Sequence, residues 1–169
     1  MRPNPIAYIA SPLGFSEVGR FYYYTELVHP IKGIGFEIID PRVLTSPKLV
    51  EAATRLPYGR KKKKAWTRLN PIIGKNNATA IESADLVVAV LDGVDVDSGT
   101  ASEIGYAAAL GKTIFGYRGD FRSSSDNDGS IVNLQVEYFI RQSGGNIVMS
   151  RGELTNALIA YREQLERSE

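Results

Sequence analysis

The densest group of residues able to do chemistry lies in one stretch near the middle of the chain. It holds Asp92, Asp95, Asp97 and Glu103, with Gly99 between the last two. Two carboxylates that face one reacting centre suit glycosyl transfer, because one can attack the anomeric carbon while the other manages the proton of the leaving group. We therefore take Glu103 and Asp97 as candidate catalytic residues, and Asp92 and Gly99 as candidate substrate-binding residues.

The same residues have a purely structural interpretation. Thr100 and Glu103 fit a capping box, in which a hydroxyl and a carboxylate satisfy free backbone donors where a helix begins. Aspartates are also common turn residues. The spacing alone therefore leaves catalysis and helix capping as alternatives.

The rare residue types narrow the chemistry. The sequence contains no Cys, and His29 is its one His. Thiol chemistry and zinc sites built from Cys and His are therefore excluded. His29 precedes Pro30, so we expect it in the last turn of a helix and not in a catalytic triad. Catalysis must rest on carboxylates, hydroxyls, amides or lysines, and we expect neither a metal nor another cofactor.

Charge and hydropathy exclude other partners. The net charge is +1, so the chain as a whole has no electrostatic reason to bind nucleic acid. The basic run 60–64 has no interleaved aromatic side chains, which favours a solvated loop over a phosphate-binding patch. No segment is apolar for long enough to span a bilayer or to serve as a secretory signal. We expect a cytoplasmic protein that binds neither membranes nor nucleic acid.

Short apolar, β-rich runs alternate with helical patterns along the whole chain, as is typical of a parallel sheet covered by helices on both faces. Strands are predicted at residues 6–10, 36–39, 86–91, 113–117 and 146–149, and helices near residues 17–28, 46–55, 70–83, 100–110, 131–142 and 153–166. This order predicts a single domain, residues 1–169, with a flavodoxin-like, doubly wound α/β fold of five parallel strands. Ligands of such sheets bind beyond the carboxyl ends of the strands.

These residues resemble a known family. The match covers most of the chain and rests on Tyr8, on residues 84–90, on Asp97, Gly99 and Glu103 with the residues 104–107 and 110–112 that follow, and on Asn133-Leu134. Together they are similar to the signature of the nucleoside 2-deoxyribosyltransferases. The resemblance implies exchange of the base of 2′-deoxynucleosides for a free purine or pyrimidine base, without a cofactor.

The resemblance also implies a role for individual residues. Glu103 is expected to be the nucleophile that carries the sugar covalently, and Tyr8 to hydrogen-bond to it and hold it in position. Asp97 is expected to contact the substrate and handle the proton of the base. Phe15 would stack on the base, and Asn133 would reach the sugar 5′-hydroxyl in a neighbouring subunit. The last role implies a homo-oligomer with shared active sites.

Two further residues are candidates for substrate binding, Asn77 and Gln135. Asn77 stands where the family often has an aspartate, so it can hydrogen-bond to a base but cannot buffer a proton. By their own patterns, Tyr8 also suits a core position in a strand, Asn133 a helix N-cap, and Phe15 a hydrophobic contact at the start of the first helix.

Two other functions stay open. A nucleoside or 5′-monophosphate N-glycosidase of the same fold would pass the sugar to water. Its phosphate site would fall in the loop 11–15, which has one Ser and is otherwise apolar. A non-catalytic flavodoxin-like binding module would use the acidic loop for a metal or a partner. A receiver-like module would need a lysine after the last strand, and residues 146–150 contain none.

Overall fold

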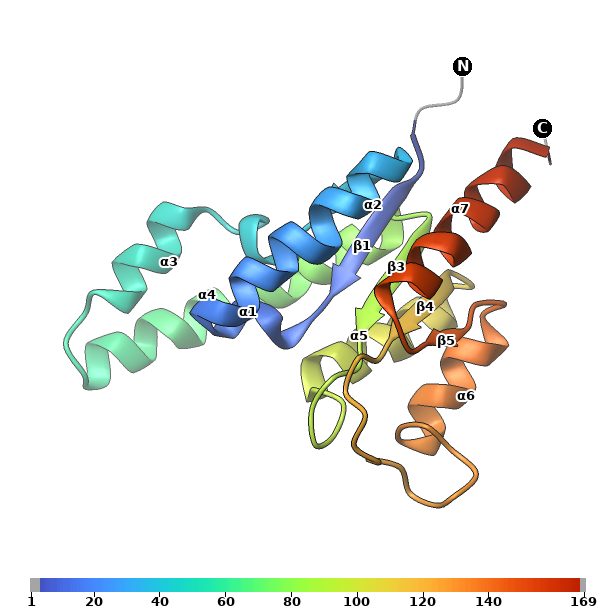
Figure 1. The fold of residues 1–169 in the computed structure, drawn as a ribbon. Coiled ribbons are helices and arrows are strands. Elements are labelled where there is room, and N and C mark those ends of the chain that lie inside the picture. The colour runs from blue at the N-terminus through green and yellow to red at the C-terminus, as the bar shows by residue number, and fades with distance from the viewer. Residues whose placement is uncertain (1–3, 168–169) are drawn as a thin grey trace.

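The computed structural model describes residues 4–167, which build one parallel sheet with helices on both faces (Figure 1). The strands are β1 (Ile6–Ala10), β2 (Glu37–Ile39), β3 (Leu86–Val90), β4 (Thr113–Tyr117) and β5 (Ile147–Val148). They are all parallel and lie in the order β2-β1-β3-β4-β5. This order is that of flavodoxin-like sheets, so the predicted fold class is confirmed.

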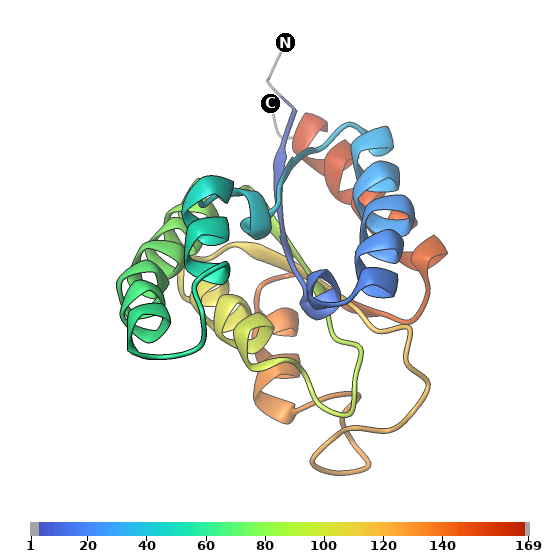
Figure 2. The same ribbon diagram turned by 90° about the vertical axis from the view of Figure 1, so that its left-hand side faces the viewer.

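The alternation of side chains along the strands divides the core into two halves. Ala7 and Ile9 face one cluster, which contains Tyr23, Leu27 and Leu158. This half is covered by the first long helix and by α7 (Arg151–Arg167). Tyr8 and Ala10 face the other cluster, which is covered by α4 (Arg60–Ser83), α5 (Ser98–Ala109) and α6 (Leu134–Gln142). Figure 2 shows the two groups of helices on opposite sides of the sheet.

The first helix is longer than predicted. It runs without a break through α1 (Glu17–Tyr22), a π-helical stretch η2 (Tyr23–Val28) and α2 (His29–Ile34). The prediction that His29 lies in the last helical turn is wrong, because the helix continues to Ile34 and is capped by Gly35 at φ 104°. The π-helical stretch just ahead of Pro30 offers a reason: proline lacks an N–H and crowds the preceding turn, and a wider turn accommodates it.

The basic run 60–64 is not a loop but the beginning of α4. This helix pairs with α3 (Pro47–Thr54), and the two extend from the body of the protein as a hairpin (Figure 1). Ala53 and Leu69 are buried where the helices meet. The side chains of the run stay mostly exposed, but packing between the two helices stabilises its helical conformation. Helix α4 therefore begins ten residues earlier than predicted and continues through Pro71.

The chain changes direction between β1 and β3, since β1 leads to β2 on one side and β3 leads to β4 on the other. A crevice at such a switch point is the usual ligand site of open α/β sheets. The segments that border it are η1 (Pro12–Phe15) after β1, η3 (Pro41–Val43) after β2, and the loop between β3 and α5. Over residues 4–167, no helix is both long and apolar enough to cross a membrane.

Candidate active site

A hydrogen bond between β1 and α5 marks the centre of the site. The hydroxyl of Tyr8 donates to Oε1 of Glu103 across 2.7 Å. The pleat of β1 directs Tyr8 to the face of the sheet that α5 covers, where Tyr8 is fully buried. Two residues distant in sequence are thus joined as expected, and Glu103 is held at the crevice in one orientation.

Asp97 caps α5. Its Oδ2 accepts hydrogen bonds from the backbone N–H of Thr100 at 3.0 Å and from the Thr100 hydroxyl at 3.3 Å. The helix therefore starts at Ser98, earlier than predicted, and Thr100 does not begin a capping box with Glu103. Both Asp97 and Thr100 are good N-cap residues, and Asp97 is the one that caps α5. Glu103 falls in the second turn, where its carboxylate is free of any capping role.

Asn77 of α4 approaches the same carboxylate. Its Nδ2 lies 3.4 Å from Oε1 of Glu103, at the long end of hydrogen-bond distances. The Oδ1 of Asn77 is buried and has no hydrogen-bond partner. A buried acceptor without a partner is costly, and Asn77 is one of the residues that line the pocket described below.

Burial and neighbouring charges shift the pKa values of the central pair. Burial raises the pKa of Glu103 above its ordinary value, the hydrogen bond from Tyr8 opposes that rise, and the charge of Asp97 adds to it. Burial and the Glu103 carboxylate both raise the pKa of Tyr8. Tyr8 therefore stays protonated and acts as a permanent donor to Glu103.

These groups open into a pocket of about 380 Å³, a size suited to a small organic ligand. Its walls come from the loops after β1, β2 and β3 and from α3, α4 and α5. The lining residues are Ser11, Gly14, Phe15, Pro41, Arg42, Thr45, Val50, Trp66, Ile73, Asn77, Asp97, Gly99, Thr100 and Glu103. Apolar and aromatic side chains thus line the same pocket as the two carboxylates, a combination that suits a flat ring joined to a sugar.

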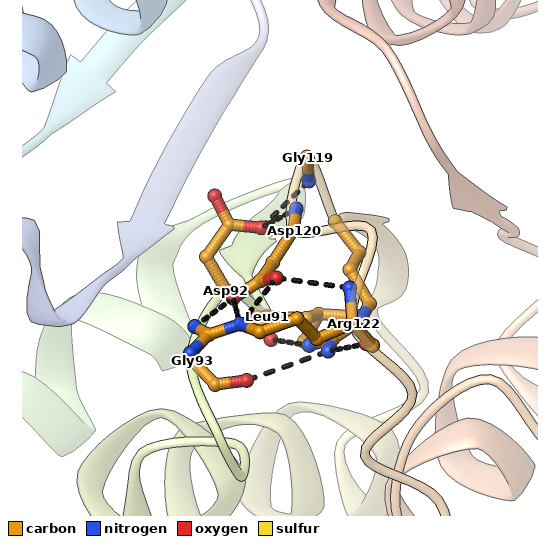
Figure 3. A network of polar contacts seen from close by, with 7 residues as sticks. Leu91, Asp92, Gly93, Gly119, Asp120 and Arg122 are labelled. Carbon is orange, nitrogen blue, oxygen red and sulfur yellow. Dashed lines mark hydrogen bonds and ion pairs between the residues drawn. The ribbon is translucent and has the colours of Figure 1, made fainter.

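Three candidate substrate-binding residues, Asp92, Asn133 and Gln135, do not line this pocket. Asn133 caps α6, where its Oδ1 accepts from the backbone N–H groups of Gln135 at 3.0 Å and Val136 at 3.3 Å. Gln135 is exposed on the same helix. Asp92 accepts from the backbone N–H groups of Gly119 at 2.6 Å and Asp120 at 2.8 Å, so it ties together the loops after β3 and β4 (Figure 3).

The buried Arg118 belongs to the same network, and the sequence did not point to it. Its guanidinium donates to the carbonyl oxygens of Leu91 and Arg122, each at 2.6 Å, and of Gly93 at 3.4 Å. These bonds fix the start of the loop that ends at Asp97. Arg42, Thr45, Val50 and Trp66 of the pocket were missed as well. Their position next to strand ends or on the hairpin becomes visible only once the fold is known.

Across residues 4–167, no three His, Asp or Glu side chains gather as ligands for a metal ion. The site is thus a carboxylate pair, a tyrosine and an amide beside a small pocket at the switch point of a flavodoxin-like sheet. The sequence profile of the nucleoside 2-deoxyribosyltransferase family matches residues 7–135. The chain belongs to that family.

Solved structures share the fold over nearly the whole chain. A 2-deoxyribosyltransferase from Bacillus psychrosaccharolyticus is 21% identical, with 93% of this chain and 95% of that chain covered and a TM-score of 0.65. The enzyme from Leishmania mexicana is 23% identical, with 94% and 97% covered and a TM-score of 0.62. The CMP N-glycosidase BcmB from Clostridium botulinum is 20% identical, with 92% and 98% covered and a TM-score of 0.52. A search of curated protein sequences finds no match.

Proposed function

We propose that this chain is a nucleoside 2-deoxyribosyltransferase that exchanges the base of 2′-deoxynucleosides through a covalent deoxyribosyl–Glu103 intermediate. The observation that carries the proposal is the 2.7 Å hydrogen bond from Tyr8 to Glu103 at the wall of the pocket. A carboxylate fixed through one oxygen keeps the other oxygen available for attack. Family membership supports the same reaction.

In the first half of the reaction, the ionised Glu103 attacks the anomeric carbon of the sugar. The bond between that carbon and the base nitrogen breaks, and the electron pair leaves with the base. The departing base takes a proton from Asp97, whose Oδ1 is not used in the bonds that cap α5. Phe15, Trp66 and Asn77 all line the pocket, so we expect the two aromatic rings to stack on the base and the Asn77 amide to hydrogen-bond to the substrate.

In the second half, a new base enters and the steps reverse. Its nitrogen gives its proton to Asp97 and attacks the anomeric carbon, and the ester bond to Glu103 breaks. Two displacements at one carbon return the sugar to its original configuration, and the first base leaves before the second binds. The reaction should therefore retain configuration and follow ping-pong kinetics.

The alternative is hydrolysis, in which water takes the place of the second base. It draws support from the structural similarity to an N-glycosidase, a likeness of fold. For a 5′-monophosphate substrate the pocket offers little, because Arg42 is the one basic residue among those that line it and its charge already meets Asp40. We therefore favour nucleosides over nucleotides and transfer over hydrolysis.

The proposal is tested by incubating the protein with 2′-deoxyinosine and free adenine, and in parallel with guanine or thymine so that base preference does not hide transfer. Chromatography should detect the new 2′-deoxynucleoside, and Glu103→Ala should form none. Free deoxyribose as the main product with abundant acceptor base would establish the hydrolase instead. A Glu103→Ala protein that still transfers at the wild-type rate would refute the covalent mechanism.

The substrate should be a 2′-deoxynucleoside and not a ribonucleoside. A 2′-hydroxyl withdraws electron density and destabilises the oxocarbenium-like transition state, and it also needs room beside Glu103. We expect a much higher kcat/KM for 2′-deoxyinosine than for inosine, measured by the same chromatography. Equal turnover of the two nucleosides would contradict this expectation.

We also propose that the active form is a homo-oligomer. The reason is Asn133, which lies outside the pocket of its own chain while the family resemblance assigns it to the sugar. A partner subunit would have to supply it, and the symmetry of a closed oligomer would give every site the same help.

A further inference from the structure

The α3–α4 hairpin concentrates the positive charge of the protein. Between Glu51 and Glu82 the sequence has eight basic residues and no acidic one, whereas the rest of the chain has 12 basic and 19 acidic residues. Among residues 4–167, Arg55 is the one of the eight that forms an ion pair, with Glu51. The net charge of +1 therefore hides a strongly uneven distribution, in which the hairpin is positive and the remainder is negative.

The tip of the hairpin is hollowed by a pocket of about 380 Å³, which we call the tip pocket. It is lined by Tyr58, Gly59, Arg60, Lys62, Lys63 and Trp66. The basic run contains no aromatic side chain of its own, but the fold supplies one from each end. Residues three and four apart share a helix face, so Trp66 lies beside Lys62 and Lys63 on α4, and Tyr58 stands fully exposed in the turn before that helix.

The basic side chains of the tip pocket have different partners. Lys62 donates to the carbonyl oxygen of Thr54 at 2.8 Å and so ties the end of α3 to α4. Arg60 and Lys63 are exposed, and within the described residues 4–167 neither side chain has a hydrogen bond or an ion pair. Cations held this close repel one another, and a bound anion relieves that repulsion.

We propose that the tip pocket is a second ligand site, which binds a nucleoside diphosphate or triphosphate. The base contacts the aromatic side chains of Tyr58 and Trp66, and the phosphates meet Arg60 and Lys63. Aromatic platforms beside basic side chains are the usual means of binding a base together with its phosphates. The site is distinct from the pocket of Glu103, which none of the basic residues of the tip pocket lines.

The distribution of charge favours a free nucleotide over a long nucleic acid. The basic residues are confined to the hairpin, and the rest of the chain carries an excess of acidic residues that repels an extended polyanion. A nucleotide needs only the tip pocket, whose volume suits one small ligand.

Trp66 supplies the signal for the experiment, because it is the one Trp of the chain and lines the tip pocket. Its fluorescence is followed while the wild-type protein is titrated with adenosine, AMP, ADP and ATP, and calorimetry repeats the ATP titration. Each added phosphate offers acceptors to charged donors, so we expect ATP to bind at least about 10-fold more tightly than AMP. Added salt should weaken ATP binding, because the basic side chains are exposed.

Three variants locate the site. Arg60→Ala combined with Lys63→Ala should weaken ATP binding at least about 10-fold, and Tyr58→Ala should weaken it about fivefold or more through lost stacking. Lys61→Ala combined with Lys64→Ala is the matched control. It removes the same charge from the same helix, but neither residue lines the tip pocket, so ATP binding should change by no more than about threefold.

Four results overturn the proposal. They are equal binding of AMP and ATP, ATP binding that survives in Arg60→Ala/Lys63→Ala and so belongs to the active-site pocket, inorganic tripolyphosphate that binds as tightly as ATP, and an oligothymidylate of about ten nucleotides that binds more tightly than ATP. The last result would identify a nucleic-acid surface instead. No deoxynucleoside is present in these titrations, so a failure of the transfer assay leaves the nucleotide site standing.

Discussion

Replacing Tyr8 by Phe tests the central contact of the site, because it removes one donor and keeps the buried ring. The lost bond is the 2.7 Å contact to Oε1 of Glu103, and Asn77 at 3.4 Å is too distant to replace it. A hydrogen bond to a charged group contributes about 1.5–3 kcal/mol. Since about 1.4 kcal/mol corresponds to a factor of ten in rate, we expect kcat/KM for 2′-deoxyinosine to fall about 10- to 150-fold.

The same substitution should change the pH dependence. The hydrogen bond from Tyr8 lowers the pKa of Glu103 against the effect of burial, so its loss raises that pKa further. Glu103 must be ionised to attack, and activity is lost as the pH falls through its pKa. The acidic limb of the kcat/KM profile should therefore move to higher pH in Tyr8→Phe.

Tyr106→Phe is the matched control, since Tyr106 also donates to a glutamate, Glu82, on the exposed surface. It should leave both the rate and the profile unchanged. Near-ultraviolet circular dichroism should show that Tyr8→Phe keeps its packing. A loss smaller than twofold, or an acidic limb that stays in place, would refute the idea that Tyr8 orients and ionises the nucleophile.

Three further substitutions test the other parts of the site. Asp97→Asn keeps an N-cap for α5 but removes the proposed acid, so kcat should fall. It also removes the charge that raises the pKa of Glu103, so the acidic limb of the rate profile should move to lower pH; a limb that moves upward would contradict this. Glu103→Gln should raise the thermal midpoint near pH 8, because a carboxyl whose pKa is raised by folding loses stability progressively as the pH rises from the ordinary glutamate pKa to the raised one. Below pH about 4 the carboxyl is protonated in both the folded and the unfolded state, so the gain should vanish there. Mixing inactive Glu103→Ala with Asn133→Ala under conditions of subunit exchange should restore partial activity, because some sites then combine both wild-type residues; a fully active monomer in sedimentation would rule out a shared site.

Strands β1 and β4 were the most predictable elements of the fold. Runs of buried apolar residues fixed β1 and β4 at their observed bounds, since a fully covered parallel strand has a continuous apolar pattern. Tyr8 and Glu103 were paired through the family resemblance, and the alternation of side chains in β1 explains why the pair can form. The α3–α4 hairpin between β2 and β3 was harder to predict from the sequence, because it depends on contacts between the two helices and not on the charge pattern of either one.

The residues that escaped prediction share a physical reason. Arg42 and Arg118 are arginines beside strand ends, where a sequence shows only a polar residue in a loop. Their importance arises from groups far along the chain, such as the ring of Tyr23 beneath Arg42 and the carbonyl of Leu91 beside Arg118. Similarly, the sequence offers both Asp97 and Thr100 as the N-cap of α5. Asp97 takes this position because of the course of the preceding loop, which Arg118 helps to hold.

The opposing influences on Glu103 explain why the proposed nucleophile needs its hydrogen-bond donors. Burial excludes water but favours the protonated carboxyl, which cannot attack, and the charge of Asp97 adds to this effect. The hydrogen bonds from Tyr8 and Asn77 stabilise the ionised carboxylate and so lower the pKa of Glu103. The proposed attack therefore depends on these two donors as much as on the carboxylate itself, because they keep Glu103 ionised in a pocket that otherwise favours its protonated form.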